Sequence, residues 1–193
     1  MMEERKNRYL KLRSDILNSI NLNEEWKTTN KCNCYGYAMG FDKSESDIFY
    51  FAYQLGRIGF ELSHLKDPSS NRFEKYFNKS FQELFELDLD TLGIEYKSVS
   101  EDFESLCDID SDGYLSWVVA LYQRDGDKSD AVDFHFLRKD QNGVWSHKQG
   151  YKGIVKNTDE DGRLLTHLDT TIRSGSETHP YKQVGIYNLR LKR

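Results

Sequence analysis

The chain has 193 residues, which is enough for one well-filled core and too few for two comfortable domains, so we expect a single domain over 1–193. Hydrophobic residues make up 37% of the chain, and 12 Tyr, 11 Phe and 3 Trp supply much of the area that can be buried. The formal charge of −5 argues against nucleic acid or an anionic membrane as a partner, because both attract basic surfaces.

The first eight residues are mostly charged or polar and precede mixed sequence, unlike the apolar core of a signal peptide. No apolar run is long enough to span a bilayer. We therefore expect a protein that stays in the cytoplasm or leaves by a route that uses no signal peptide. Its three cysteines cannot all pair with one another, so a disulfide framework is not expected.

Two amphipathic helices are predicted in the first half of the chain. Apolar residues recur at helical spacing over about 3–20, and again over about 71–92, where aromatic and leucine side chains form one stripe. Gly93 is a natural stop for the second helix. Between the two helices, the segment 48–58 is apolar on all sides, which favours a buried helix and leaves a strand as the alternative.

Strands are predicted in the second half. Residues 94–99 alternate as a strand does, and residues 114–122 are apolar and β-branched enough for a central strand. The segments 133–138 and 144–148 flank the turn sequence Lys-Asp-Gln-Asn-Gly and form a predicted hairpin. A last strand is predicted over 184–191. Helices followed by an antiparallel sheet indicate an α+β fold.

Cys34 opens the sequence Cys-Tyr-Gly-Tyr-Ala, which can begin a helix. A thiol at a helix start faces unpaired backbone N–H groups and the positive end of the helix dipole, and both favour the reactive thiolate. We therefore predict that Cys34 is a nucleophile whose pKa lies below the usual value of about 8.5. Gly36 and Gly40 each cost a helix about 1 kcal/mol relative to Ala, so this helix should be short.

Two histidines of the predicted hairpin supply a base and an orienting partner. If the hairpin turns symmetrically about Gln141, His135 lies directly opposite His147, and their Cβ atoms are about 5 Å apart on one face of the sheet. One imidazole can then hydrogen-bond the other and fix its tautomer. A cysteine nucleophile needs a base, and the base needs a third group that orients it. The candidate catalytic residues are therefore Cys34, His135 and His147.

A cysteine at a helix start, followed by sheet histidines about twelve residues apart, resembles the papain-like superfamily of cysteine peptidases, and particularly its NlpC-type Cys-His-His cell-wall endopeptidases. The resemblance implies a papain-like fold in which amino-terminal helices pack on an antiparallel sheet. It also implies that Cys34 is the nucleophile, His135 the general base and acid, and His147 the orienting third member. The wording Asn-Cys-Tyr-x-Tyr-Ala, His-Phe and Trp-Ser-His-Lys further resembles a set of bacterial proteins of this type, whereas the Asp-Cys-Ser-Gly wording of NlpC enzymes is absent.

Further residues are candidates for supporting roles. An oxyanion hole would combine the backbone N–H of Cys34 with a second donor, for which Asn33 and Asn30 are candidates. If His147 is instead a surface residue, Asp169 or another acidic side chain is the alternative third member of the triad.

Two metal sites are weaker interpretations. Cys32 and Cys34 with a distant histidine resemble zinc ligands, but a Cys-x-Cys pair without a second clustered pair is a weak signal. Residues 108–113 begin like an EF-hand loop, yet Val119 stands at the twelfth position, where a bidentate Glu is required. An acidic turn is the better interpretation, and we expect neither a metal nor another cofactor.

These features together predict a thiol hydrolase or transferase that acts on an amide bond through an acyl-enzyme, as a peptidase, amidase, deamidase or acyltransferase does. The expected substrate is a peptide, a protein or a peptidoglycan-like amide. The alternative is a non-catalytic binding or toxin-neutralising protein with a papain-like fold. Thiol reactivity and an open groove beside Cys34 would separate the two functions.

Overall fold

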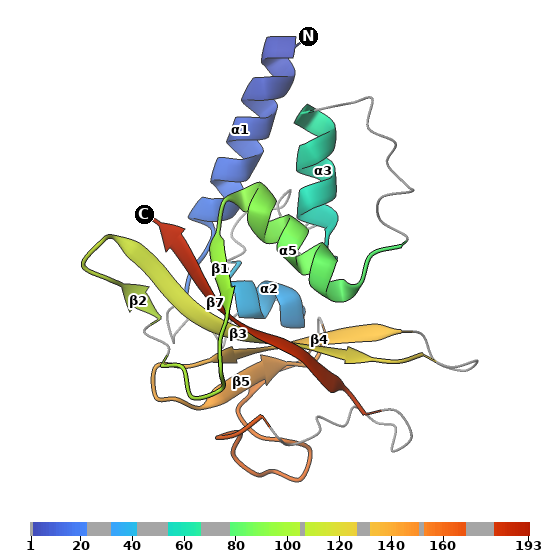
Figure 1. Ribbon diagram of the computed structural model, residues 1–193, viewed down its shortest axis with the longest axis vertical. Coiled ribbons are helices and arrows are strands. Elements are labelled where there is room, and N and C mark those ends of the chain that lie inside the picture. Colours follow the sequence, from blue (N-terminus) through green and yellow to red (C-terminus); the bar gives the residue numbers. More distant parts are fainter. Residues whose placement is uncertain are drawn as a thin grey trace.

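The computed structural model describes residues 2–22, 32–41, 54–66, 78–104, 107–126, 132–150, 153–168 and 180–193. Over these residues the chain forms four helices and an antiparallel sheet of seven strands, which is the predicted α+β arrangement. Figure 1 shows the helices gathered on one side of the sheet, with α1 rising away from it. No helix in these ranges is long and apolar enough to cross a membrane.

The helices are α1 (Met2–Asn18), α2 (Cys34–Met39), α3 (Arg57–Lys66) and α5 (Phe81–Leu92). The strands are β1 (Glu95–Ser98), β2 (Asp108–Ile109), β3 (Tyr114–Arg124), β4 (Asp133–Lys139), β5 (Trp145–Lys148), β6 (Val155–Lys156) and β7 (Lys182–Lys192). The strand order is β1-β7-β3-β4-β5-β6, and β2 pairs with the first part of β3. The last strand of the chain therefore lies inside the sheet.

The strands predicted over 94–99, 114–122, 133–138, 144–148 and 184–191 are confirmed as β1, β3, β4, β5 and β7. The strands β2 and β6 were not predicted, because two residues are too few to show alternation.

The helix predicted over 71–92 starts later than its apolar stripe suggests. The Ser80 side chain accepts the Glu83 N–H at 3.2 Å, and the Glu83 carboxylate accepts the Ser80 N–H at 2.8 Å. This capping box begins α5 at Phe81. Gly93, with a φ of 71°, ends the helix as predicted, since glycine adopts this left-handed conformation without strain.

The helix α3 was not predicted as a separate element. Most of the predicted segment 48–58 lies outside the described residues, as does the stretch 71–77 of the other predicted helix. Ile58 and Leu62 of α3 are buried one helical turn apart. This spacing is visible in the sequence, but it involves only two residues. They follow an apolar run in which no helical period can be recognised.

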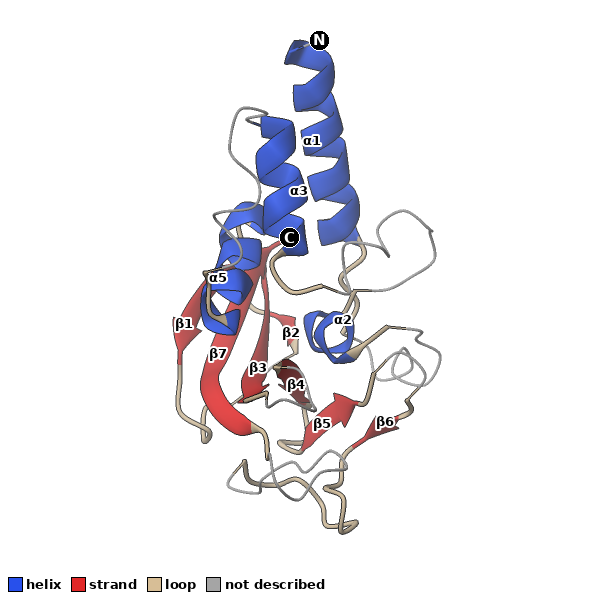
Figure 2. Ribbon diagram, turned by 90° about the vertical axis from the view of Figure 1, so that its right-hand side faces the viewer, coloured by secondary structure: helices blue, strands red, loops and turns tan. Residues whose placement is uncertain are grey.

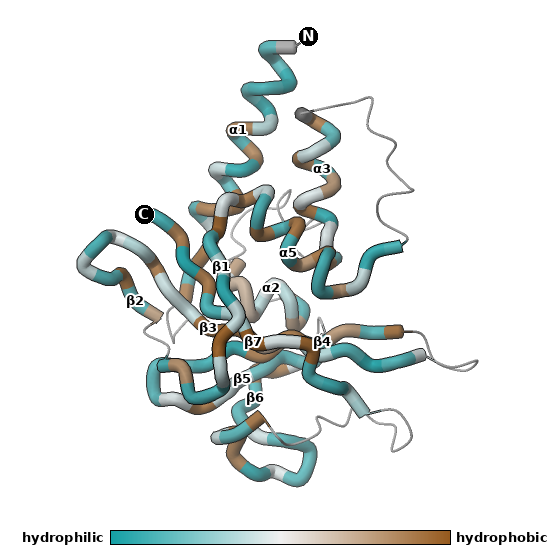
Figure 3. The backbone as a smooth tube through the Cα atoms, in the orientation of Figure 1, coloured by the Kyte–Doolittle hydropathy of each residue, from teal (hydrophilic) through white to brown (hydrophobic). Residues whose placement is uncertain are grey.

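Hydrophobic clusters cover both faces of the sheet. On β3, Trp117 and Val119 belong to the cluster beneath the helices, which also includes Ile16 of α1, the confirmed helix near the amino end. Val118 and Ala120 belong to the cluster on the opposite face. A strand buried on both faces is apolar at successive positions, as β3 is from Val118 to Leu121. Figure 3 shows mostly hydrophilic residues along the outer part of α1, where that helix rises away from the sheet.

Candidate active site

The short helix α2 presents Cys34 as its first residue. The Asn33 side chain caps the helix by accepting the Gly36 N–H at 3.0 Å. Gly40, with a φ of 71°, ends it after six residues, all of them buried. The predicted short helix with Cys34 at its start is therefore present.

Contacts to β4 and β5 hold α2 over the sheet, as Figure 2 shows. The Cys34 thiol donates a hydrogen bond to the Phe134 carbonyl, with 3.9 Å between sulfur and oxygen. The hydroxyls of Tyr37 and Ser146 are hydrogen-bonded at 2.7 Å, and the Arg138 guanidinium lies 4.7 Å from the centre of the Tyr37 ring. Both strands that carry the candidate histidines thus also position the candidate nucleophile.

The predicted hairpin is present, but its predicted register is wrong. Leu137, not His135, lies opposite His147. The hairpin therefore does not turn symmetrically about Gln141. The offset from the predicted register is two residues, so both histidines still project from the same face of the sheet.

The conformation of the turn explains the offset. The Asp140 N–H bonds the Val144 carbonyl at 2.9 Å, and the Gly143 N–H bonds the Asp140 carbonyl at 2.9 Å. Gly143 has a φ of 80°, as expected for a three-residue hairpin loop that ends in a left-handed glycine. The centre of the loop is thereby Asn142, one residue beyond the position that symmetry about Gln141 requires.

The two histidines form a hydrogen-bonded chain with a backbone carbonyl. Nε2 of His135 lies 2.9 Å from Nδ1 of His147, and Nε2 of His147 lies 3.1 Å from the Thr158 oxygen. Because a carbonyl oxygen only accepts, a neutral His147 carries its proton on Nε2 and accepts at Nδ1. His135 then carries its proton on Nε2 and keeps a lone pair on Nδ1. The chain sets both tautomers and leaves Nδ1 of His135 as a base.

Burial keeps both imidazoles in the neutral state that this chain requires. It lowers the pKa of His135 to about 3, and the neighbouring His147 adds to the effect. It also lowers the pKa of His147, against the hydrogen bond to the Thr158 carbonyl, which favours the charged form. Neither ring carries a positive charge near neutral pH.

The Cys34 thiol is also neutral, contrary to the prediction from its position at a helix start. Burial raises the pKa of Cys34 to about 12; the Phe136 N–H opposes this rise and the nearby Asp133 carboxylate adds to it. The neutral His135 supplies no positive charge that would stabilise a thiolate. In this structure Cys34 and His135 are therefore a neutral thiol and a neutral imidazole.

Cys34 and His135 approach β4 from different sides. Phe134 and Phe136 pack into the cluster beneath α2, so His135, which lies between them, projects to the opposite face. There its ring centre lies 5.5 Å from that of Tyr181. Among the described residues, no hydrogen bond joins the Cys34 sulfur to His135.

A pocket of about 460 Å³ is lined by both residues and lies at the start of β4, in the part of that strand that does not pair with β5. Its walls come from the start of α2, the end of β3, the start of β4, the segments that follow β5 and β6, and the residue before β7: Asn33, Cys34, Arg124, Asp133, Phe134, His135, Gln149, Gly150, Glu160 and Tyr181. The predicted nucleophile and base thus share one solvent-accessible space.

The remaining predicted site residues fall into two groups. Asn33 lines the pocket, and His147 is buried against His135 and not at the surface. Asn30 and Asp169 lie outside the described residues. Of the predicted supporting residues, the structure therefore brings His147 next to His135 and Asn33 next to Cys34.

Arg124, Asp133 and Tyr181 are among the pocket residues that were not singled out from the sequence. The Tyr181 hydroxyl donates to the Asp133 carboxylate at 2.5 Å, and the Arg124 guanidinium lies 5.4 Å from the centre of the Tyr181 ring. Asp133 precedes His135 by two residues, and strand alternation places the two on one face, so the sequence did contain a signal for it. Tyr181 has no such signal, because it joins the site from a distant part of the chain.

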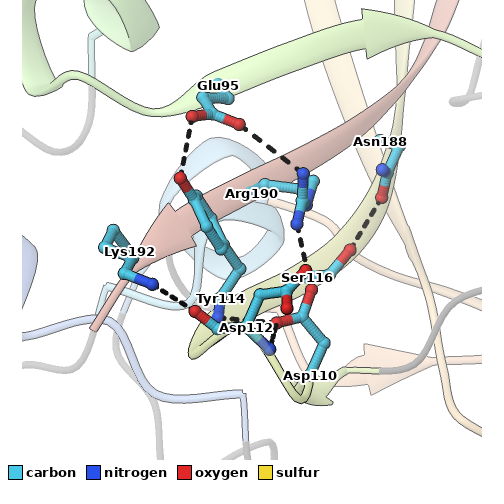
Figure 4. A network of polar contacts seen from close by, with 8 residues as sticks. All are labelled: Glu95, Asp110, Asp112, Tyr114, Ser116, Asn188, Arg190 and Lys192. Carbon is cyan, nitrogen blue, oxygen red and sulfur yellow. Dashed lines mark hydrogen bonds and ion pairs between the residues drawn. The ribbon is translucent and has the colours of Figure 1, made fainter.

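The described residues contain no group of three His, Cys, Asp or Glu side chains that could hold a metal ion. The acidic turn predicted over 108–113 is present. Its Asp110 carboxylate accepts the N–H groups of Asp112 and Tyr114 at 3.0 and 2.8 Å, and the Arg190 guanidinium at 3.0 Å (Figure 4). These bonds use both oxygens of Asp110 within the protein.

Comparisons with known proteins find no match to this chain among protein-family models, curated proteins or solved structures. The interpretation of the pocket therefore rests on its own geometry and chemistry.

Proposed function

We propose that this protein is a papain-like cysteine hydrolase or transferase that acts on an amide bond, with Cys34, His135 and His147 as its catalytic residues. The hydrogen-bonded chain from the Thr158 carbonyl through His147 to His135 carries the proposal. The chain makes Nδ1 of His135 a proton acceptor. His135 also lines the same pocket as Cys34, the cysteine at the start of α2. A thiol nucleophile requires such an oriented base.

The reaction follows from these roles. Cys34 gives its proton to Nδ1 of His135 while its sulfur bonds the substrate carbonyl carbon, and the oxygen takes the negative charge. The C–N bond then breaks, and the departing nitrogen takes the proton from His135. Water or an amine attacks the acyl-enzyme, passes a proton to His135, and the proton returns to sulfur as the product leaves. The Cys34 N–H, with Asn33 as candidate second donor, stabilises the oxyanion.

The neutral resting state restricts how this reaction begins. The thiol is hydrogen-bonded to the Phe134 carbonyl, and no preformed thiolate–imidazolium pair exists. Substrate binding must therefore turn the thiol toward His135 or enclose a water molecule that bridges the two. Proton transfer is then coupled to attack on the carbonyl, and His147 holds the His135 tautomer throughout.

A second candidate function is a binding or toxin-neutralising protein that keeps this fold without turnover. The buried neutral thiol favours it, since Cys34 is 6% exposed and a binder has no need of a thiolate. The histidine chain favours the enzyme, because it leaves the lone pair of a base on Nδ1 of His135, a residue of the same pocket as Cys34.

Acyl transfer to Cys34 distinguishes the two functions without knowledge of the substrate. We expect p-nitrophenyl acetate to acetylate Cys34 and to release p-nitrophenol over many turnovers, as followed by absorbance and by mass spectrometry of peptides. Cys34→Ser and His135→Ala should abolish the turnover, whereas the matched control Cys107→Ser should retain it. Equal acetylation of Cys32 and Cys34, or turnover unaffected by His135→Ala, would leave the binding protein as the better description.

A further inference from the structure

Tyr181 makes contacts around His135 that the proposed reaction does not use. Its ring centre lies 5.5 Å from the His135 ring centre, with 42° between the planes, and its hydroxyl donates to the Asp133 carboxylate at 2.5 Å. Asp133 lies two residues before His135 on β4, and its other oxygen accepts the Phe134 N–H at 2.8 Å. Tyr181 is thus attached at two points to the strand that carries the candidate base.

The contacts of Arg124 complete this cluster. Arg124 lies opposite Asp133 in the ladder between β3 and β4. Its guanidinium lies 5.4 Å from the centre of the Tyr181 ring and has a nitrogen 3.8 Å from the Asp133 carboxylate. Tyr181 is 5% exposed although it stands at the pocket wall. Strands β3 and β4 therefore hold the side chain in place from two sides.

The two rings next to His135 constrain it in different ways. His147 bonds the Nε2 edge of the imidazole, and the two ring planes meet at 82°. Tyr181 packs against the imidazole at a smaller angle, with 42° between the two ring planes. A hydrogen bond to one edge fixes the tautomer, but only packing against the ring prevents rotation away from that bond.

We propose that Tyr181 is a positioning residue which, anchored by the Asp133 carboxylate, holds the His135 imidazole against His147 and keeps water from its remaining side. The inference rests on the proposed function in one respect, that His135 is the base; the claim about the ring itself is independent of catalysis.

Charged and titratable groups pair with His135, contact its ring or line the same pocket: Cys34 from α2, Tyr122 and Arg124 from β3, Asp133 from β4, His147 from β5, Glu160 after β6 and Tyr181 before β7. Burial dominates over these charges in lowering the pKa of His135. Loss of the Tyr181 ring would admit water to His135 and would thereby raise that pKa toward the ordinary value of 6.5.

The test uses nuclear magnetic resonance of the imidazole nitrogens in full-length protein labelled with ¹⁵N-histidine, between about pH 4 and 8. In the unsubstituted protein, His135 should remain neutral with its proton on Nε2 across this range. Tyr181→Leu should bring the His135 titration into the range and mix its tautomers. Tyr181→Phe keeps the ring and loses the anchor, so it should show a smaller shift in the same direction.

A matched pair at Asp133 separates the anchor from the packing. Asp133→Asn keeps an oxygen that accepts the Tyr181 hydroxyl and should preserve the His135 resonances, whereas Asp133→Ala should reproduce the shift of Tyr181→Phe. If Tyr181→Leu is folded and its His135 resonances are unchanged, Tyr181 is only a packing residue and the inference is overturned. If Tyr181→Leu does not fold, unchanged His135 resonances in Tyr181→Phe overturn it instead.

Failure of the proposed function would give a different result. If the resonances respond as expected but p-nitrophenyl acetate never acetylates Cys34, the positioning role is retained and the catalytic role of His135 is lost. If acetylation proceeds and the resonances do not respond to either Tyr181 variant, the enzyme is retained and the positioning role is lost.

Discussion

Two opposing influences act on the Cys34 thiol, and the magnitude of each decides its protonation. A helix start stabilises a nearby negative charge by about 0.3–1 kcal/mol, and less when the helix is short. Burial raises the pKa of Cys34 from 9.0 to about 12, which corresponds to about 4 kcal/mol against the thiolate. The sequence reveals that Cys34 stands at a helix start, but it does not reveal how deeply the thiol is buried. Burial has the larger effect on the pKa.

Alkylation by iodoacetamide should report this balance. Only the thiolate reacts, so Cys34 should be labelled slowly at pH 7 and faster as the pH rises toward 12. Cys107, which is partly exposed, should be labelled before both buried cysteines. Mass spectrometry of labelled peptides gives the order, and Cys107→Ser verifies the peptide assignment. Labelling of Cys34 ahead of Cys107 at pH 6 would show that a stabilising positive charge acts on its sulfur after all.

His147 offers a second prediction at the scale of one residue. Replacement by Phe keeps an aromatic ring but removes both the acceptor for His135 and the donor to Thr158. Without that acceptor the His135 tautomer is no longer fixed, so turnover of p-nitrophenyl acetate should fall by about 10²–10⁴-fold. His167→Ala is the control, since the His167 side chain is 72% exposed and lies outside the pocket. Equal rates in the two variants would remove His147 from the triad.

At the scale of elements, a buried carboxylate joins three helices behind the pocket. Asp88 of α5 accepts the N–H groups of Gly56 and Gly59, at 2.7 and 2.6 Å, where α3 begins. It also accepts the hydroxyl of Tyr35, the neighbour of Cys34 in α2, at 2.8 Å. Asp88 thus binds the start of α3 and one side chain of α2.

The protonation of Asp88 should make stability depend on pH. Burial raises its pKa from 3.8 to about 7, against the hydrogen bonds from Gly59, Tyr35 and Gly56 that favour the carboxylate. The folded state then binds the proton more tightly than the unfolded state. The contribution of Asp88 is complete below about pH 4 and is lost as the pH rises through about 7.

Asp88→Asn removes this titration while it keeps the size of the side chain. Between about pH 4 and 7, the free energy of unfolding of the unsubstituted protein should fall relative to that of Asp88→Asn by up to about 1.4 kcal/mol per pH unit. Urea denaturation at several pH values measures the difference. If the free energies of unfolding of the two proteins differ by a constant amount across this range, the N–H groups at the start of α3 keep Asp88 ionised throughout.

Elements were easier to predict than their junctions. The apolar run of β3 located that strand because both of its faces are buried, and the turn sequence located β4 and β5, whereas the hairpin register depended on the left-handed conformation of Gly143. The capping box of Ser80 and Glu83 is visible in the sequence, but the apolar stripe before it suggests an earlier start. Tyr181 could not be placed at all, since only the fold brings the residue before β7 to the start of β4.

At the scale of the whole molecule, β3 separates the pocket from a polar network at its other end. Arg124 lines the pocket where β3 ends, and Tyr114, where β3 begins, belongs to the network in Figure 4. Eleven residues at about 3.3 Å each place the two ends roughly 30–35 Å apart. In the network, Arg190 of β7 lies 4.2 Å from the centre of the Tyr114 ring and joins Asp110 and Glu95 at 3.0 and 3.7 Å.

This separation predicts that the network contributes to stability and not to the chemistry of the pocket. Arg190→Met keeps much of the apolar stem but loses both ion pairs and the contact of its charge with Tyr114, which should lower the free energy of unfolding. The loss should shrink at high salt, because the Arg190 side chain is 34% exposed and its charges are screened.

Tyr114→Phe is the matched control, since it removes only the hydrogen bond of 3.2 Å to Glu95 and keeps the ring beneath Arg190. Its effect should be smaller and should depend less on salt. Urea denaturation at low and high salt measures both variants, and p-nitrophenyl acetate measures the acylation of Cys34 in each. A folded Arg190→Met protein with altered acylation would show that the two ends of β3 are coupled, because the network contacts no residue of the pocket directly among the described residues.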